Sequence, residues 1–178
     1  KGDDSKTTYR LGRYYAPYGL RVADHTSYVR RYLGFNILEE TYGLGASINK
    51  SSSEYHLVAH ASDPLQVTTR REFGATGMAE WRKDNWLYGA STRVTKGEND
   101  LRALASLHYK HWFEGKKLML MAEVDGGFQK FDDADGTSRL QLAGYAGPVW
   151  FPMDGMSVSL AYELFDQDLL VKDVERHA

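Results

Sequence analysis

Apolar and polar residues alternate with a period of two through most of the chain. In the segment LRALASLHY, Leu101 and Leu107 fall on one face, whereas Arg102 and His108 fall on the other. Leu104 is an exception, because it stands among the polar positions. A period of two is the spacing of side chains that share one face of a β-strand. The pattern therefore predicts an all-β chain.

Turn signals rich in Gly, Asn, Asp and Pro separate the alternating runs, among them KDN, KGEND, DDADG and PMDG. They divide the chain into about nine strands of an antiparallel meander. Several strands reach roughly a dozen residues, which exceeds the ~5–6 typical of soluble sheets and matches the ~9–11 that cross a bilayer at a tilt. The expected strands lie near residues 9–15, 41–49, 54–62, 71–82, 86–95, 100–113, 117–131, 138–150 and 156–166.

The composition suits a β protein whose strands are wet on one face. The 178 residues carry a net charge of −2, with 12 Tyr, 17 Gly and no Cys. A nearly balanced charge argues against a dedicated nucleic-acid binder. The absence of Cys excludes disulfides and thiolate metal sites. No stretch of the sequence is long and apolar enough for a transmembrane helix.

The tryptophans favour a membrane barrel over a soluble sandwich. In an antiparallel meander alternate turns lie at the same end, and all four Trp residues flank the tight turns of one end. A membrane–water interface selects such a ring of aromatic side chains. Trp112 is out of register with the apolar face of its strand, whereas Phe113 is in register. The expected interface aromatics are Trp81, Trp86, Phe113 and Trp150.

The opposite face of the expected strands is strongly polar and carries charges of both signs. On a soluble sandwich these residues would form the solvated exterior, whereas on a barrel wall they would line a hydrated lumen. Ala and Gly recur in the middle of the apolar face, and a lipid environment tolerates small residues there. The expected pore-lining residues of the strands are Arg82, Arg93, Arg102, Lys110, Glu80, Glu123, Asp125, Arg139 and Glu163.

A basic and aromatic stretch covers residues 9–36, YRLGRYYAPYGLRVADHTSYVRRYLGFN. Its parts LGRYYAPYGLR and DHTSYVRRYLGFN resemble the Gly-Arg/Gln-aromatic and Pro-aromatic-Gly segment of bacterial outer-membrane porins related to the phosphate-selective porins. Similar segments occur in porins that sheathe multihaem cytochromes for electron transfer. The resemblance covers residues 9–36, and the remainder of the chain is compatible with any large barrel.

The resemblance implies a barrel strand followed by a loop, residues 20–40, that folds inward and carries cations near the constriction. It assigns Arg13, Arg21, Arg30 and Arg31 to this basic segment. Arginines in a wet lumen attract anions and pair with nearby acids. The alternative is that Arg30 and Arg31 decorate an exposed loop. The acids of the polar face argue against a strongly anion-selective pore.

No constellation for catalysis or metal binding is indicated. His56 and His60 share one face of a strand but stand about 13 Å apart along it, too far to share a metal ion. The DADG segment lacks the closing Glu of a calcium loop, and no Ser has the flanks of a nucleophile elbow. We therefore expect no catalytic residue, no metal and no cofactor, and a protein that is not an enzyme.

Together these features predict an antiparallel transmembrane β-barrel in the bacterial outer membrane. Residues 1–178 are expected to form one barrel domain or a segment of a larger barrel, because the chain ends in VKDVERHA rather than in a strand with a terminal aromatic residue. The expected partners are membrane lipid, small polar solutes, and further barrel strands or a multihaem cytochrome, but not nucleic acid.

The expected function is passive passage of small polar solutes through a porin-type channel. The alternatives are a barrel sheath around an electron-transfer cytochrome conduit, a soluble β-sandwich or lipocalin-like binding module, and a barrel enzyme. The apolar face separates the barrel from the sandwich. If Leu107, Leu120, Leu142 and Leu160 were buried beneath a second sheet, the barrel prediction would be wrong.

Overall fold

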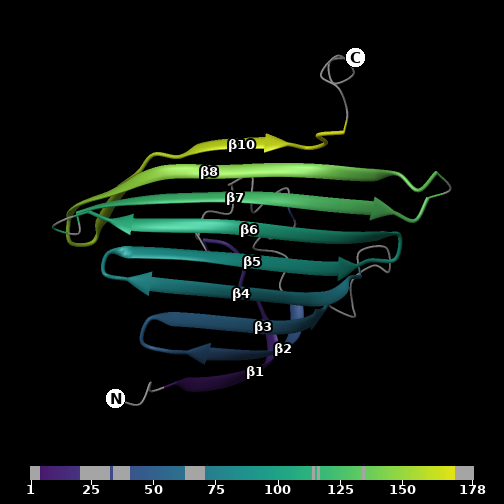
Figure 1. Ribbon diagram of the computed structural model, residues 1–178, viewed down its shortest axis with the longest axis horizontal. Coiled ribbons are helices and arrows are strands. Elements are labelled where there is room, and N and C mark those ends of the chain that lie inside the picture. Colours follow the sequence, from purple (N-terminus) through teal and green to yellow (C-terminus); the bar gives the residue numbers. More distant parts are fainter. Residues whose placement is uncertain are drawn as a thin grey trace.

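The computed structural model describes residues 5–20, 33, 41–62, 71–113, 115, 117–133 and 135–170. Among these residues, ten strands form one antiparallel sheet in which successive strands are neighbours as far as β8 (Figure 1). No helix in this part of the chain is long and apolar enough to cross a membrane. The strands are β1 (Lys6–Tyr14), β2 (Thr41–Asn49), β3 (Ser53–Ala61), β4 (Phe73–Lys83), β5 (Trp86–Lys96), β6 (Asp100–Trp112), β7 (Leu118–Phe131), β8 (Ser138–Met153), β9 (Met156–Ser159) and β10 (Tyr162–Asp166).

The all-β antiparallel meander expected from the alternation is confirmed, with strand bounds that differ by a few residues. The expectation of one unbroken strand over residues 156–166 is wrong, because β9 and β10 are separate and both pair with β8. The register places Leu160, between them, opposite Pro148, and the Leu160 N–H donates to the Pro148 carbonyl at 3.1 Å. Proline has no N–H to return the second bond of this pair, so the ladder is interrupted there.

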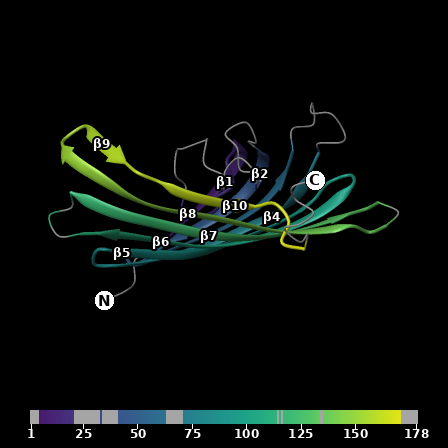
Figure 2. The same cartoon turned by 90° about the horizontal axis from the view of Figure 1, so that it is seen from above.

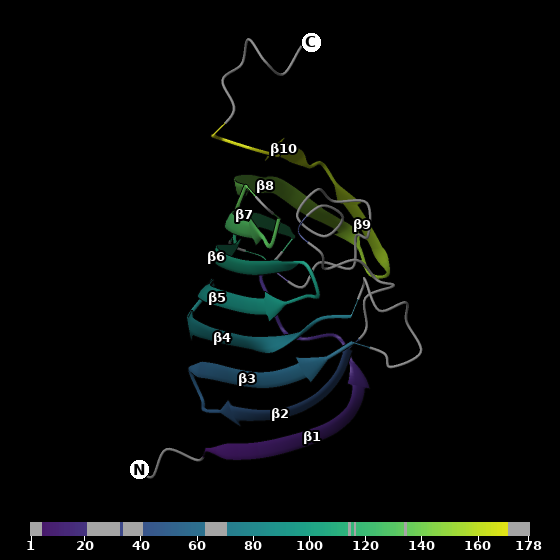
Figure 3. The same cartoon turned by 90° about the vertical axis from the view of Figure 1, so that its right-hand side faces the viewer.

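The sheet of the described residues is open, with β1 at one edge and β10 at the other. Closure into a barrel is therefore not observed in this part of the chain. The sheet curls into a trough, and its edges bend toward the same side (Figures 2 and 3). Residues 15–20, drawn in violet, run along this concave side (Figure 3).

The two faces of the sheet have the reverse of the burial expected in water. On the convex face, Leu107 and Leu160 are 64% and 73% exposed, Leu120 is 37% exposed and Leu142 is half-buried. None of the described strands lies over this face, so the four leucines are not covered by a second sheet. The concave face is buried but polar, with Thr76, Glu80, Ser91, Arg93, Ser106, His108, Glu123 and Asp125 among its residues.

The connections differ in length between the two ends of the sheet. Tight turns join β2 to β3, β4 to β5, β6 to β7 and β8 to β9 at one end, which we call the tight-turn end. In the turn from β4 to β5, Asp84 has a φ of 52°, a left-handed conformation that Asp tolerates better than most residues. At the opposite end, which we call the long-loop end, successive strands are joined through residues 15–40, 62–72 and 132–137 of the sequence and through the short segment 97–99.

Aromatic side chains gather on the convex face at the tight-turn end. Trp81 stacks on Tyr88 with ring centroids 5.6 Å apart. Trp86 packs against His111 at 4.3 Å, and Phe113 meets His111 edge-on at 4.6 Å. The register carries this belt across to Trp150 on β8, which is also exposed on the convex face, whereas Trp112 occupies a concave position.

Candidate functional site on the concave face

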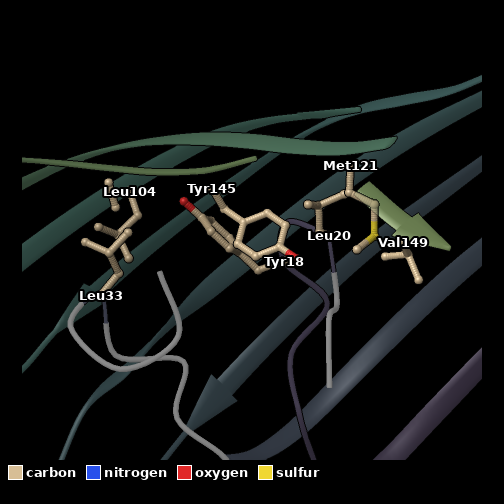
Figure 4. Packing of buried hydrophobic residues seen from close by; sticks show 8 residues of the cluster. Tyr18, Leu20, Leu33, Leu104, Met121, Tyr145 and Val149 are labelled. Carbon is tan, nitrogen blue, oxygen red and sulfur yellow. The ribbon is translucent and has the colours of Figure 1, made fainter. Parts of the chain in front are cut away.

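Residues 15–20 leave β1 and cross the concave face, and we call them the strap. Tyr18 and Leu20 of the strap are buried, as is Leu33 (Figure 4). Leu20 lies beside Met121 and Val149 (Figure 4). The residues of β6, β7 and β8 that complete this apolar cluster are Leu104, Met121, Ala143, Tyr145 and Val149. Burial of apolar surface thus holds the strap against a face that is otherwise polar.

The backbone of the strap is also hydrogen-bonded to side chains of the sheet. The Gly19 N–H donates to Oγ of Ser91 at 3.0 Å, and the Leu20 N–H donates to Oε2 of Glu123 at 3.1 Å. The ammonium group of Lys110 donates to the Leu20 carbonyl at 3.1 Å. These three bonds come from three adjacent strands, so the strap is fixed across the trough rather than along one strand.

Gly19 of the strap lies in close contact with Glu123 of the sheet. Its φ of +57° lies in the left-handed region, which is unfavourable for residues with a side chain. A Cβ at this position would lie 1.7 Å from Oε1 of Glu123, the oxygen that accepts a hydrogen bond from Ser106 at 3.0 Å. Any side chain at residue 19 would therefore displace the carboxylate that holds Leu20.

Tyr18 remains a neutral phenol in its buried position. Burial and the neighbouring carboxylates of Asp125 and Glu123 raise the pKa of Tyr18 well above its ordinary value of 10.0, although Arg93 acts in the opposite direction. Asp125 itself is 0% exposed. The strap therefore covers the buried acids with a hydroxyl group that keeps its proton across the physiological pH range.

A polar network crosses β2, β3 and β4 on the concave face. Oγ of Ser47 lies 2.7 Å from Nδ1 of His56, and Nε2 of His56 contacts the carboxylate of Glu54. The guanidinium of Arg82 donates to Glu54 at 2.6 Å and lies 3.8 Å from Glu80. Each charge in this network has a partner of opposite sign or a hydrogen-bonding group, as buried polar groups require.

Glu80 and His108 form a buried pair that spans β5. Nε2 of His108 lies 3.1 Å from Oε1 of Glu80, with side-chain exposures of 0% and 2%. Gly89 on β5 stands between them, and a Cβ there would lie 2.4 Å from Nε2 of His108. Because glycine leaves this space open, side chains of the non-adjacent strands β4 and β6 can meet across the strand between them.

Further arginines lie toward the long-loop end of the concave face. Arg93 is 4.0 Å from the carboxylate of Glu72, and Arg102 is 3.8 Å from that of Asp100. The guanidinium carbon of Arg139 lies 5.1 Å from the centroid of an aromatic ring on β7. The face as a whole thus carries charges of both signs, among which Glu80, Glu123, Asp125 and Arg93 are buried and Arg82 and Arg102 are more exposed.

Most residues that the sequence assigned to a pore lining lie on this face. Arg13 does not, because it pairs with Tyr42 and shares the convex side of β1 with Leu11. Arg21, Arg30 and Arg31 lie outside the described residues, as does the expected loop over residues 20–40 apart from Leu20 and Leu33. The concave residues are Glu80, Arg82, Arg93, Arg102, Lys110, Glu123, Asp125, Arg139 and Glu163.

The apolar cluster beneath the strap was not predicted. Its signal in the sequence was a set of exceptions to the alternation, in which Leu104, Met121 and Val149 occupy polar-face positions of three successive strands. Such exceptions on neighbouring strands indicate that something apolar lies over the polar face.

Comparisons with protein-family models, with curated proteins and with solved structures find no match to this chain. Over the described residues, the fold and the site are those of an open antiparallel sheet with an exposed apolar face and a charged face that the strap crosses. Its resemblance to porins over residues 9–36 stays a prediction.

The substitution Gly19→Ala is expected to destabilise the protein more than Gly136→Ala. Gly136 has a φ of +60° with nothing near its missing Cβ, so its replacement carries only the backbone cost, about 1 kcal/mol. Gly19→Ala should lower the free energy of unfolding by about 2 kcal/mol more than Gly136→Ala does, because it also disrupts hydrogen bonds to the Glu123 carboxylate. Urea titrations followed by circular dichroism measure both free energies of unfolding, and equal losses would contradict the assigned role of Gly19.

The Glu80–His108 pair is expected to show energetic coupling in a double-mutant cycle. Each of Glu80→Ala and His108→Ala should lower the free energy of unfolding by about 3 kcal/mol, because each removes the hydrogen-bond partner of a buried polar group. The loss of unfolding free energy in the double variant should be at least about 1 kcal/mol smaller than the sum of the losses in the two single variants. A control cycle of His108→Ala with His60→Ala should be additive, because His60 contacts Thr76 instead. Additivity in both cycles would refute the pairing.

Proposed function

We propose that this chain forms a wall of an outer-membrane β-barrel of the porin type, whose concave face borders a passage for small polar solutes. The observation that carries this proposal is the reversed burial of the two faces. In water, leaving a side chain such as Leu57 or Leu107 exposed forgoes about 1.5–3 kcal/mol, so a soluble sheet buries its leucines. In lipid the same exposure is favourable, and the polar groups belong inside.

The length of the uncharged run on the convex face supports a membrane setting. On β7 the convex positions from Leu118 to Phe128 carry no charge, and Lys130 follows them. These ten steps of about 3.4 Å extend roughly 34 Å along the strand, or about 24–28 Å at the 35–45° tilt of barrel strands. The apolar band of outer-membrane barrels is about 25 Å tall.

The aromatic belt supports the same setting and suggests an orientation. Trp and Tyr rest well at the headgroup level, where the ring is partly in apolar surroundings and the N–H or O–H stays wet. The belt of Trp81, Trp86, Phe113 and Trp150 coincides with the tight-turn end. Because such barrels place short turns at the periplasmic side, this end would face the periplasm and the long-loop end the exterior.

A membrane setting also requires partners for the two edges of the sheet. Unpaired backbone groups cost several kcal/mol each in hydrocarbon. The outer edges of β1 and β10 must therefore pair with one another or with further strands. A soluble sandwich would instead need a second layer over the convex face, and none of the described strands supplies it.

Passage would be governed by diameter and by paired charges, without covalent chemistry. The strap narrows the trough, and its hydrogen bonds to Ser91 and Glu123 keep it in place. Glu80, Glu123 and Asp125 are buried and therefore act mainly in holding the structure. A solute would meet the more exposed side chains, such as Arg82, together with their partners.

Reconstitution of the purified protein into liposomes tests the proposal. Release of a small encapsulated sugar should exceed that from protein-free liposomes, and release of a large dextran should not. The protein should also require detergent to stay dispersed outside a membrane. A chain that remains monomeric in aqueous buffer and leaves the liposomes sealed would rule out the proposed function.

The substitution Leu107→Arg distinguishes lipid from water as the neighbour of the convex face. Leu107 is 64% exposed, and Met153 beside the tight turn is similarly exposed at 66%. If the convex face lies in water, both Leu107→Arg and Met153→Arg should change stability by less than about 0.5 kcal/mol. If it lies in lipid, only Leu107→Arg should be destabilising in vesicles, by about 2–4 kcal/mol. Unfolding titrations in vesicles measure the difference.

A further inference from the structure

A groove of about 790 Å³ lies on the convex face of β1 to β5. It arises because Ala59 and Ala75 are cross-strand partners and stand between two larger neighbours, Leu44 on β2 and Val94 on β5. The two alanines form a low floor between taller apolar sides. The groove therefore has the shape and the apolar lining that an extended hydrocarbon chain fits.

The long-loop end of the groove is bounded by a row of residues whose net charge is positive. One continuous cross-strand row runs from β1 to β7 and supplies the convex residue nearest the end of each strand. It includes three cations and no acid, and we call it the rim row. Its members are Arg13, Tyr42, Ala61, Phe73, Lys96, Leu101 and Lys130.

Lys96 is the cation of the rim row that lines the groove itself. Its ammonium group pairs with the carboxylate of Asp132, and the two side chains are 37% and 48% exposed. Exposed ion pairs contribute little to stability, so an incoming anion can replace Asp132 readily. The groove thus joins an apolar floor to an exchangeable cation at the level where its strands end.

We propose that this groove binds an anionic phospholipid, with an acyl chain along Ala59 and Ala75 and the headgroup phosphate at Lys96. Lipid binding here rests on the proposed function, because the convex face meets acyl chains only in a membrane. Charge complementarity selects the occupant, since the cation Lys96 lines the groove at its rim and the rim row contains no acid. Basic side chains at a membrane surface attract anionic lipids. Arg13, which the sequence assigned to the pore, belongs in this account to the lipid-facing rim.

The test uses the full chain in neutral detergent, titrated with phosphatidylglycerol or with phosphatidylcholine of identical acyl chains, and native mass spectrometry of bound lipid. Phosphatidylglycerol should bind about fivefold more tightly, the factor expected for one cation near a lipid phosphate. Lys96→Gln should reduce this preference to about twofold or less. Asp132→Asn should strengthen phosphatidylglycerol binding, because it removes the competing carboxylate.

Two controls separate the groove from general attraction to the basic rim. Lys130→Gln removes a cation of the same row outside the groove. It should leave the roughly fivefold preference for phosphatidylglycerol unchanged. Ala59→Leu fills the floor at an exposed site and should weaken both lipids alike. Equal binding of the two lipids, or a preference that Lys96→Gln leaves unchanged, overturns the lipid site. That result leaves the proposed function standing if the same preparation needs detergent and releases sugar from liposomes.

Discussion

The exposure of apolar side chains along the convex face is the constraint on which the remaining structure depends. Large apolar residues recur there on each strand from β1 to β8, and each would forgo about 1.5–3 kcal/mol of burial in water. None of the described strands covers this surface, and in the proposed function acyl chains cover it. The alternation that places Leu57 and Leu107 outward also directs charged residues inward. The polar concave face is therefore a consequence of the same alternation, and its buried charges need partners within the protein.

The concave face satisfies its charges in two ways. Toward β2 to β4, Glu54, Arg82 and Glu80 form a chain of ion pairs that His108 completes across β5. Toward β5 to β8, the strap donates the Leu20 N–H to Glu123 and the Gly19 N–H to Ser91, and it places the neutral phenol of Tyr18 beside Asp125 and Glu123. Glycines at residues 19 and 89 make both arrangements possible, because each leaves space for a carboxylate or an imidazole. The strap, held by hydrogen bonds to the sheet, therefore forms a fixed part of the trough surface.

The sequence was sufficient for the strands because both signals that define them are local. Alternation marks each strand, and turn residues such as Asp84 mark the ends. The break near Leu160 was not predictable in the same way, because it depends on which residue faces Pro148 in the neighbouring strand. Likewise the apolar cluster joins Leu20 to Met121 and Val149, more than a hundred residues along the chain, and no local pattern pairs them. Arg13 was expected near the constriction because of its motif, whereas the alternation of its own strand groups it with Leu11 on the convex face.

Fluorescence quenching by lipids with brominated acyl chains tests most directly which face meets the membrane. Two single-tryptophan variants suffice, one retaining Trp150 on the convex face and the other Trp112 on the concave face, with the remaining Trp residues changed to Phe. In vesicles with bromines near the headgroup, Trp150 fluorescence should be strongly quenched and Trp112 fluorescence nearly unchanged. Quenching of Trp112 equal to or greater than that of Trp150 would contradict the assignment of the convex face to lipid.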